Sequence, residues 1–542
     1  MKLVTVDQMI AIEREADEAG LTYEKMMNNA GHGLANVLQS LEGDVPARSA
    51  AGLVGPGNNG GDALVALTEL AAAGWTVSAY ITRRQEDSLV SRLRKAGGQI
   101  LEHAQDHEHL RLMDMLRSAA VILDGLLGTG AKLPVTGEIM DVMATTLAFL
   151  GSSAPAPYLV AVDCPSGIDC DTGEVSAQTL PADLTVTMAA VKQGLLRMPA
   201  CEYVGDLHVV DIGLPADLSS LSSVDVDVAD ADLVGSLLPR RAADSHKGTF
   251  GTALVVAGSV NYTGAALLAA GGAYRAGAGL VTVAVPSPLH TAISGHIPEA
   301  TWVLLPHELG VISRDAAAIL ATRLEQECDA ILIGPGLGLE NTTAEFVQRV
   351  IQGGTASAAG TSTMGFLGGS GTRLANSRRQ LPPLIVDADG LRLLSRMPEW
   401  PRALPPFSVL TPHPGEMAAL TGLTKEGIQQ DRVGVATRYA REWGHVVVLK
   451  GAFTVIASPT GQAMVIPVAT AALARAGTGD VLAGVITGLR AQGMSAYDAA
   501  VAGAWIHAQA GLHAAARLGN DASVLAGDVL SSVADVISSV GS

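Results

Sequence analysis

The stretch Gly477-Thr478-Gly479-Asp480-Val481-Leu482 joins a glycine-rich turn to the start of a helix. The apolar residues Val481, Leu482, Val485, Ile486 and Leu489 recur on one face of that helix, so the turn lies at the positive end of its dipole. Backbone N–H groups at this end can stabilise the charge of a phosphoryl group in transfer, and Asp480 can take the proton of the attacking hydroxyl. The segment therefore predicts a phosphate-handling site, with a plain N-terminal cap as the alternative role for Asp480.

Further motifs in this half of the chain follow predicted strands. They are Gly334-Pro335-Gly336-Leu337-Gly338, Asp387-Ala388-Asp389-Gly390-Leu391, Thr411-Pro412-His413-Pro414-Gly415-Glu416-Met417 and Lys450-Gly451-Ala452-Phe453-Thr454. The glycines let the backbone approach a ligand closely. Turn capping is the alternative for Asp387 and Asp389, whereas His413, between two prolines, is harder to explain as an ordinary core residue.

Short apolar runs alternate with helical stretches along most of the chain. The predicted strands are Leu53-Val54, Val77 to Ile81, Ala120 to Leu123, Tyr158 to Val162, Leu184 to Met188, Leu207 to Val210, Thr252 to Ala257, Leu280 to Val285, Ala330 to Ile333, Leu384 to Val386, Ser408 to Leu410 and Val446 to Leu449. Several are apolar throughout, which favours parallel sheets covered on both faces. An opening helix is expected after Thr5, with Gln8 completing a capping box and Met9, Ile10 and Ile12 toward the core.

The alternation breaks at residues 213 to 240, which are rich in Pro, Ser and Asp, and then restarts. We therefore predict two α/β domains, residues 1–225 and 226–542. The segment Gly353 to Gln380 is poor in large apolar residues and predicts a mobile surface insertion, with a functional lid as the alternative.

The N-terminal half has its own motifs at strand ends. Gly55-Pro56-Gly57-Asn58-Asn59-Gly60-Gly61-Asp62 precedes a helix, Asp124-Gly125-Leu126-Leu127-Gly128-Thr129-Gly130 ends a second strand, and Asp163-Cys164-Pro165-Ser166-Gly167 ends a third. Their side chains are expected to converge at one edge of the sheet, where Asn, Asp and Ser oxygens suit a hard cation. Asp163 is a candidate proton-transfer base if Lys192 faces it, and helix capping is the alternative for Asp163 and Ser166.

Composition narrows the function classes. A net charge of −18 argues against binding to nucleic acid or an anionic membrane surface. No apolar run approaches the roughly 18 residues of a membrane span, and the first residues lack the apolar region of a secretory signal. The four cysteines lack CxxC spacing, so we expect reduced thiols and a cytoplasmic protein.

The N-terminal motifs, together with Met27-Asn28-Asn29-Ala30-Gly31, resemble the NAD(P)H-hydrate epimerase (YjeF N-terminal) family over about residues 1 to 215. The resemblance implies a Rossmann-like αβα sandwich that interconverts the R and S hydrates of NADH and NADPH (NADHX and NADPHX). It implies K⁺ binding by Asn59, Asp124 and Ser166, with Asp163 and Lys192 as candidates for proton movement. The residues it implies for hydrate binding are Asn58, Asn59, Gly60, Gly61, Asp62, Gly128, Thr129, Gly130, Ala131, Lys132, Leu133, Pro134 and Asp163. Two positions depart from the family pattern, Ala63 in place of Gly and Asn28 in place of Glu.

The C-terminal motifs resemble the ADP-dependent NAD(P)H-hydrate dehydratase (YjeF C-terminal) family over about residues 230 to 540. The resemblance implies a ribokinase-like α/β domain that uses ADP and Mg²⁺ to restore NAD(P)H from the S hydrate, with AMP and phosphate as products. The implied hydrate-binding residues are Ala265, Gly336, Gly338, His413 and the catalytic Asp480. The implied nucleotide-binding residues are Lys450, Gly451, Ala452, Phe453, Thr454 and Gly479. Arg475 departs from the small residue or Thr common before this loop.

Together the two resemblances predict a bifunctional repair enzyme that epimerises and dehydrates hydrated nicotinamide cofactors, and we expect a homo-oligomer. The alternative is a kinase of a small alcohol with the ribokinase-like fold, fused to a non-catalytic N-terminal binding module. That alternative leaves the set Asn59, Asp124, Asp163 and Ser166 without an explanation.

Overall fold

The computed structural model describes residues 1–41, 45, 47–324, 328–353 and 381–540. The chain divides into two compact units, Met1–Val228 and Ala229–Ser542. The predicted insertion at 353 to 380 lies, except for its first residue, outside the described residues.

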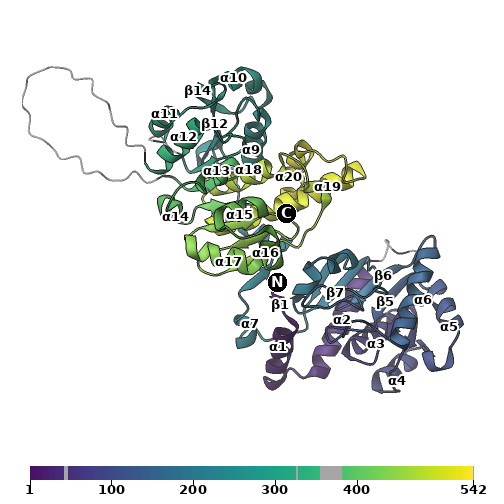
Figure 1. Cartoon of the computed structure of the whole chain (residues 1–542). Helices are drawn as coiled ribbons and strands as arrows, with labels where there is room; N and C mark the ends of the chain where they lie inside the picture. The colour runs from purple at the N-terminus through teal and green to yellow at the C-terminus, as the bar shows by residue number, and fades with distance from the viewer. Residues whose placement is uncertain (42–44, 46, 325–327, 354–380, 541–542) are drawn as a thin grey trace, which may run out of the picture. The chain divides into compact units, whose positions relative to one another are not determined.

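The first unit is built on a fully parallel sheet in the order β4-β3-β2-β5-β6-β7-β9 (Figure 1). Its strands are β2 (Ser49–Val54), β3 (Thr76–Ile81), β4 (Gln99–Glu102), β5 (Val121–Gly125), β6 (Tyr158–Val162), β7 (Leu184–Met188) and β9 (Asp206–Val210). Two short strands, β1 (Leu3–Val4) and β8 (Val191–Lys192), form a separate parallel pair, and β10 (Val226–Val228) ends the unit. The helices are α1 (Val6–Glu18), α2 (Tyr23–Ser40), α3 (Asn58–Ala72), α4 (Ser88–Lys95), α5 (Leu110–Ser118), α6 (Glu138–Ser152) and α7 (Ser219–Ser222).

Both faces of this sheet are buried, as the uniformly apolar strands predict. Val121 and Leu123 pack in one core with α1, α2, α3 and α4, whereas Ile122, between them, packs in a second core with α5 and α6. This alternation makes the unit the predicted αβα sandwich. The capping box of Thr5 and Gln8 opens α1 as expected, and Met9 and Ile12 are buried. The placement of Ile10 in the core is wrong: Ile10 is 53% exposed, because the helical period turns it away from the face that Met9 and Ile12 share.

The second unit contains a sheet in the order β21-β20-β19-β18-β17-β16-β11-β12-β13, parallel from β19 to β13 and antiparallel at β20 and β21. Its strands are β11 (Thr252–Val256), β12 (Leu280–Pro286), β13 (Thr301–Leu305), β16 (Ala330–Ile333), β17 (Leu384–Val386), β18 (Val409–Leu410), β19 (Val446–Leu449), β20 (Val455–Ala457) and β21 (Ala463–Val465). A small hairpin consists of β14 (His307–Glu308) and β15 (Val311–Ile312). The helices are α8 (Ala231–Leu237), α9 (Thr263–Arg275), α10 (Ser287–Ile293), α11 (Ala316–Arg323), α12 (Asn341–Ile351), α13 (Asp389–Leu394), α14 (Trp400–Ala403), α15 (Pro414–Thr421), α16 (Lys425–Gln430), α17 (Arg432–Trp443), α18 (Thr478–Ala491), α19 (Ala496–Leu518) and α20 (Ala526–Val540).

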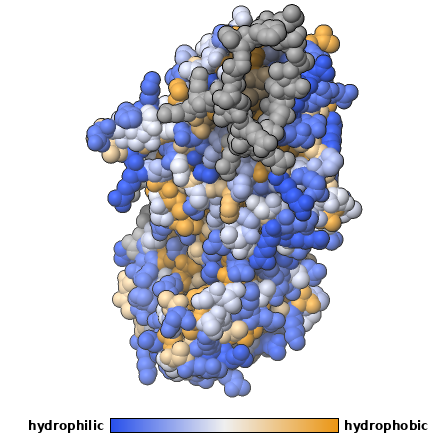
Figure 2. All heavy atoms as spheres, turned by 90° about the vertical axis from the view of Figure 1, so that its left-hand side faces the viewer, coloured by the Kyte–Doolittle hydropathy of each residue, from blue (hydrophilic) through white to orange (hydrophobic). Residues whose placement is uncertain are grey.

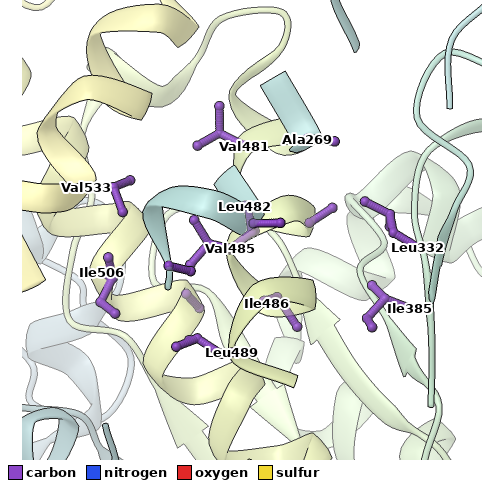
Figure 3. Packing of buried hydrophobic residues seen from close by; sticks show 14 of the residues in the cluster. Ala269, Leu332, Ile385, Val481, Leu482, Val485, Ile486, Leu489, Ile506 and Val533 are labelled. Carbon is purple, nitrogen blue, oxygen red and sulfur yellow. The ribbon is translucent and has the colours of Figure 1, made fainter. Parts of the chain in front are cut away.

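Helix α18 lies at the centre of the second unit's core. Val481, Leu482, Val485, Ile486 and Leu489 face the sheet residues Leu332 and Ile385 and the neighbouring helices α9, α19 and α20 (Figures 1 and 3). The approach of α9 is so close that a Cβ atom at Gly484 would meet the carbonyl oxygen of Ala269 at 2.1 Å. Close packing on all sides therefore fixes the start of α18, where Asp480 lies.

Every strand predicted from an apolar run is present, and the predicted α/β fold class is confirmed for both units. On the face seen in Figure 2, hydrophobic residues are scattered among hydrophilic ones. Among the described residues, no helix is both long and apolar enough to cross a bilayer. All four cysteines are free.

Candidate active sites

The glycine-rich segment of the first unit forms the start of a helix. Gly57 is the N-terminal cap of α3, so Asn58 to Asp62 lie in its first turns and not in a loop before it. Gly60 packs on Gly55, where a Cβ would meet a carbonyl oxygen at 2.3 Å. Arg84 fixes the segment from outside by donating hydrogen bonds to the carbonyl oxygens of Gly55 (3.3 Å) and Gly57 (3.0 Å). The segment is therefore rigid and presents its N–H groups in one direction.

Asn59, Asp124 and Ser166 converge as predicted. The Ser166 hydroxyl donates to Asp124 Oδ1 (2.6 Å), and the Ser166 N–H donates to Asp124 Oδ2 (2.8 Å). Asn59 Nδ2 donates to the carbonyl oxygen of Leu127 (2.8 Å), whose N–H in turn donates to Ser166 Oγ (2.9 Å). No helix begins in the segment from Asp163 to Ser166, so neither Asp163 nor Ser166 caps a helix.

This oxygen cluster fits a monovalent or other hard cation. Asn59 Oδ1 is buried and has no hydrogen-bond partner among the described residues. Asp124 is 1% exposed, and complete burial raises the pKa of its carboxyl, an effect that the hydrogen bonds from Ser166 only partly oppose. A bound cation would give the Asn59 Oδ1 atom a partner and would balance the charge of the buried Asp124 carboxylate.

Asp163 and Lys192 form a buried ion pair. Asp163 has a φ of 63°, a strained conformation for a non-glycine residue that the surrounding structure must hold. Its Oδ1 atom accepts hydrogen bonds from Lys192 Nζ, from the Met188 N–H (3.0 Å) and from Thr187 Oγ1 (3.1 Å). Lys192 is 1% exposed and also donates to Thr187 Oγ1 and to the Met188 carbonyl oxygen, both at 3.0 Å. Three donors on one oxygen atom are the surroundings of an ionised carboxylate.

A cavity of about 400 Å³ brings many of the predicted residues together. Of the predicted hydrate-binding residues it is lined by Asn58, Asn59, Asp62, Gly128, Thr129, Gly130, Ala131 and Asp163. Gly60, Gly61, Lys132, Leu133, Pro134 and Lys192 do not line it. It is also lined by residues that sequence reasoning missed, among them Glu13, Tyr23 and Met26.

Three carboxylates line this cavity, from Glu13, Asp62 and Asp163. Burial and then the charge of Asp163 raise the pKa of Glu13. The same two causes, in the same order, raise the pKa of Asp62 well above its usual value. Like charges close together in a poorly hydrated space favour protonation of some of the carboxyl groups, so the cavity can hold both an acid and a base.

In the second unit, Asp480 lies in the first turn of α18 but does not cap it. The cap is Gly477, in the left-handed conformation with a φ of 91°, and no side chain completes the cap. Burial, followed by the charge of Asp387, raises the pKa of Asp480 to about 7. This carboxyl is poised to exchange a proton near neutral pH, which a general base requires.

Lys450 lies beside Asp480 in a group of buried charges. Its Nζ atom is 2.6 Å from Asp387 Oδ1 and 3.8 Å from Glu416 Oε2. Thr411 donates to the same Asp387 oxygen at 2.7 Å. Burial alone would lower the pKa of Lys450, but Asp387 and Glu416 outweigh it and raise that pKa. A Cβ at Gly479 would lie 3.5 Å from Lys450 Nζ, so the ammonium group lies next to the N–H groups that open α18.

The remaining predicted residues of this unit surround that centre or carry the loops that shape it. Gly336 touches Ala265, since a Cβ on Gly336 would be 2.8 Å from the Ala265 Cβ. The Gly338 N–H donates to Asp389 Oδ2 at 3.0 Å. Asp387 and Asp389 therefore bind other segments and do not merely cap a turn.

His413 has a structural role that the sequence did not suggest. It is the N-terminal cap of α15, where its Nδ1 atom accepts hydrogen bonds from the N–H groups of Gly415 (2.9 Å) and Glu416 (3.3 Å). Burial and the charge of Lys450 lower the pKa of His413, which favours the neutral ring. Its other ring nitrogen, Nε2, lies 3.4 Å from Glu416 Oε1.

The side chain of Thr454 closes the turn from Lys450 to Thr454. Thr454 Oγ1 donates to the Gly451 carbonyl oxygen at 2.9 Å. Gly451 has a φ of 147° and packs against the guanidinium of Arg432, where a Cβ would approach to 3.1 Å. Phe453, with a φ of 54°, is held by a hydrogen bond from its N–H to the Val468 carbonyl oxygen at 2.9 Å.

The three departures from the family pattern are close in sequence to residues of these sites. Ala63 is fully buried in α3. Asn28 lies on α2 and accepts a hydrogen bond from Arg92 at 3.1 Å. Arg475 donates a hydrogen bond to the carbonyl oxygen of Ala522 and so braces the loop before α20.

Comparison with known proteins identifies the family. A model of the NAD(P)H-hydrate dehydratase family matches residues 253–356 and 369–533, and a model of the YjeF-related protein N-terminus matches residues 23–194. The bifunctional NAD(P)H-hydrate repair enzyme of Moorella thermoacetica is 37% identical over 98% of this chain and 95% of its own length. The chain belongs to the family of bifunctional NAD(P)H-hydrate repair enzymes.

Other relatives extend this similarity. The Escherichia coli K12 bifunctional NAD(P)H-hydrate repair enzyme is 34% identical over 97% of this chain and 92% of its own length. An ADP/ATP-dependent NAD(P)H-hydrate dehydratase from Bacillus subtilis, crystallised with ATP and Mg²⁺, is 30% identical and covers 59% of this chain and 100% of its own, with a TM-score of 0.47. The family expected from the motifs is thus confirmed over both halves of the chain.

Proposed function

We propose that this repair enzyme interconverts the R and S epimers of NADHX and NADPHX in the unit Met1–Val228 and dehydrates the S epimers with ADP in the unit Ala229–Ser542. Membership of the bifunctional family supports the pairing of activities. The observation that carries the proposal most is the state of Asp480, a carboxyl at the start of a helix with a pKa raised to about 7.

In the first unit, the cavity would hold the hydrated nicotinamide against Asp163. One oxygen atom of Asp163 is occupied by Lys192, Met188 and Thr187, whereas Oδ2 has no hydrogen bond to another described residue. That free oxygen atom would accept or return the proton of the C6 hydroxyl. Asn59, Asp124 and Ser166 would hold K⁺, whose positive charge would offset the buried carboxylate of Asp124.

In the second unit, Asp480 would remove the proton of the hydrate's C6 hydroxyl as the oxygen attacks the β-phosphorus of ADP and AMP leaves. The N–H groups at the start of α18 and the Lys450 ammonium would stabilise the negative charge on the phosphoryl group. Loss of the phosphate from C6 and of a proton from C5 then restores the dihydronicotinamide. Ala265, Gly336, Gly338 and His413 would contact the hydrate, and the turn from Lys450 to Thr454 with Gly479 would hold the nucleotide.

Mg²⁺ is proposed to arrive with the nucleotide. Among the described residues, no group of three His, Cys, Asp or Glu side chains is arranged to bind a metal ion. Mg²⁺ would neutralise the charge of the nucleotide phosphates, and this role needs no dedicated protein cage.

A small-alcohol kinase fused to a non-catalytic module is not favoured. It would leave the ion pair of Asp163 with Lys192 and the buried oxygen cluster in the first unit without a role. It would also separate the chain from full-length relatives that bear the name of bifunctional repair enzymes.

The deciding experiment adds ADP and Mg²⁺ to a mixture of R and S NADHX and follows the absorbance of NADH. Recovery of all the NADH is the expected result. Recovery of the S fraction alone would refute the epimerase, and no recovery would refute the dehydratase. Repeating the assay with K⁺ replaced by Na⁺ should slow recovery of the R fraction only.

Light scattering would test the proposed homo-oligomer, and cell fractionation would test the proposed cytoplasmic location.

A further inference from the structure

Glu13 lines the same cavity as Asp163 and belongs to no motif of the family pattern described above. It lies on α1, a different element from the strand β6 that precedes Asp163. Its carboxylate accepts no hydrogen bond and forms no ion pair with any of the described residues. A carboxyl group that lines a cavity without a partner in the protein is available to a ligand.

Lys192 is poorly placed to be the second proton-transfer group. Its three acceptors, Asp163 Oδ1, Thr187 Oγ1 and the Met188 carbonyl oxygen, use the three N–H bonds of an ammonium group. The side chain is 1% exposed and does not line the cavity. Lys192 therefore holds Asp163 in place, and a proton on the far side of the substrate must come from another group.

Helix α1 is fixed at both ends, so Glu13 is held in position. At its start, β1 pairs with β8 in a register that sets Val4 opposite Lys192, and the Val6 N–H donates to Asp171 Oδ1 at 2.9 Å. Near its end, Glu15 accepts hydrogen bonds from the N–H groups of Ser219 (2.9 Å) and Ser220 (2.8 Å). The pairing of β1 with β8 ties the helix that carries Glu13 to the strand that carries Lys192.

We propose that Glu13 is the second acid–base residue of the epimerisation and acts on the face of the nicotinamide ring opposite Asp163. The inference rests on the epimerase activity proposed above. It assigns to Glu13 the role that the sequence suggested for Lys192, and leaves Lys192 as a positioning residue.

The step balances without any further reactant. Glu13 donates its proton to the C6 hydroxyl, the C6–O bond breaks, and the N1 lone pair forms a C6=N1 double bond as water leaves. Water then attacks C6 from the opposite face and passes a proton to Asp163, which gives the other epimer. Exchange of protons with solvent restores protonated Glu13 and ionised Asp163, and the reverse reaction uses the two groups in exchanged roles.

The first test compares Glu13→Gln with Glu18→Gln, which changes an exposed carboxylate on the same helix. Glu13→Gln should slow epimer interconversion on the order of 10²- to 10⁴-fold, the usual contribution of a general acid or base. Glu18→Gln should behave as the wild type. Dehydration of pure S-NADHX by ADP should be unchanged in both variants, because that activity belongs to the second unit.

The second test separates catalysis from a structural role by running the reaction in H₂¹⁸O. The wild type should place solvent oxygen in both epimers. In Glu13→Gln, Asp163 alone should still exchange the hydroxyl of one epimer without inversion, while the other epimer exchanges only at the uncatalysed rate. Equal loss of exchange from both epimers, or interconversion at the wild-type rate, would overturn the proposal. The same one-sided exchange in Asp62→Asn but not in Glu13→Gln would assign the role to Asp62 instead. Failure of the wild type to interconvert the epimers would instead refute the proposed epimerase itself.

Discussion

Both units hold a buried lysine–aspartate pair at the carboxyl end of parallel strands, but the partner that is more deeply buried differs between them. In the first unit the lysine is the hidden partner: the Lys192 side chain is 1% exposed and that of Asp163 is 14% exposed. In the second unit the aspartate is hidden, with Asp387 at 1% and Lys450 at 17%. The less buried partner of each pair is the one that can meet a ligand. On the proposed function, the pair presents a base for a hydroxyl proton in the first unit and a cation for phosphates in the second.

In the second unit a separate carboxyl, that of Asp480, is the proposed base. Asp480 stands near the buried pair without sharing a hydrogen bond with it, and burial together with Asp387 raises its pKa to about 7. The proposed base for the hydroxyl proton, Asp480, is thus separate from the residue proposed to neutralise phosphate charge, Lys450. In the first unit, the proposed base is Asp163 itself, whose Oδ1 atom is held by Lys192.

The largest expected effect comes from removing the base of each unit separately. Asp480→Asn should slow dehydration on the order of 10²- to 10⁴-fold and leave epimer exchange intact, and Asp163→Asn should do the reverse. Steady-state assays on pure S-NADHX and on isolated epimers measure the two rates. Loss of both activities in either folded variant would contradict the division between the units.

The next largest effect is on stability, and it should differ between the Lys450–Asp387 pair and the Lys192–Asp163 pair. Lys450→Met leaves the carboxylate of Asp387 buried without its cation, which should cost about 3–5 kcal/mol of the second unit's unfolding free energy. Lys192→Met should cost less in the first unit, because Asp163 borders the cavity and can be hydrated. Trp302, Trp400, Trp443 and Trp505 belong to the second unit and Trp75 belongs to the first, so tryptophan fluorescence in urea reports the unfolding of both units. Equal losses of unfolding free energy in the two units would contradict the proposed difference between the two ion pairs.

A smaller effect should appear in the pH dependence of dehydration. Asp480 acts as a base only when ionised, so kcat/KM should rise with pH through a midpoint near its pKa of about 7 and then level off. The charge of Asp389 helps to raise that pKa, and Asp389→Asn should therefore move the midpoint to lower pH. Asparagine can still accept the hydrogen bond from Gly338. A midpoint that stays in place, or moves upward, would show that another group controls the rate.

The smallest effect is expected at a position that departs from the family pattern. Asn28 already accepts a hydrogen bond from Arg92 at the surface of α2. Asn28→Glu should replace this bond with an exposed ion pair worth less than about 1 kcal/mol and leave epimerisation unchanged. A large rise in epimerase activity, measured on isolated R-NADHX, would show that residue 28 contacts the substrate.

The sequence predicted the parts of the fold that depend on local pattern. Strands apolar throughout, such as Tyr158 to Val162, are recognisable because both of their faces are buried. Edge strands with mixed residues, such as Gln99–Glu102 and Thr301–Leu305, were missed because half of each is solvated. Ile10 was misplaced because its helical angle, and not its hydropathy, decides its exposure.

Site residues on strand ends could be predicted for the same reason, since glycines and carboxylates that follow apolar strands meet at one sheet edge. Glu13 could not. It lies in a run of charged residues on an amphipathic helix, where an exposed position is the ordinary expectation, and only the cavity distinguishes it from its neighbours. The cap made by His413 was missed because histidine is not among the usual N-terminal capping residues.

Complementation between two variants, each of which lacks the proposed base of one unit, tests the central claim most directly. Mixed R and S NADHX, with ADP, Mg²⁺ and K⁺, is treated with Asp163→Asn, with Asp480→Asn, or with both proteins together, and NADH absorbance is followed to its end point. Two independent sites predict recovery of the S fraction by the first variant, none by the second, and the whole of the NADH by the mixture. A mixture that recovers no more than Asp163→Asn alone would contradict the account.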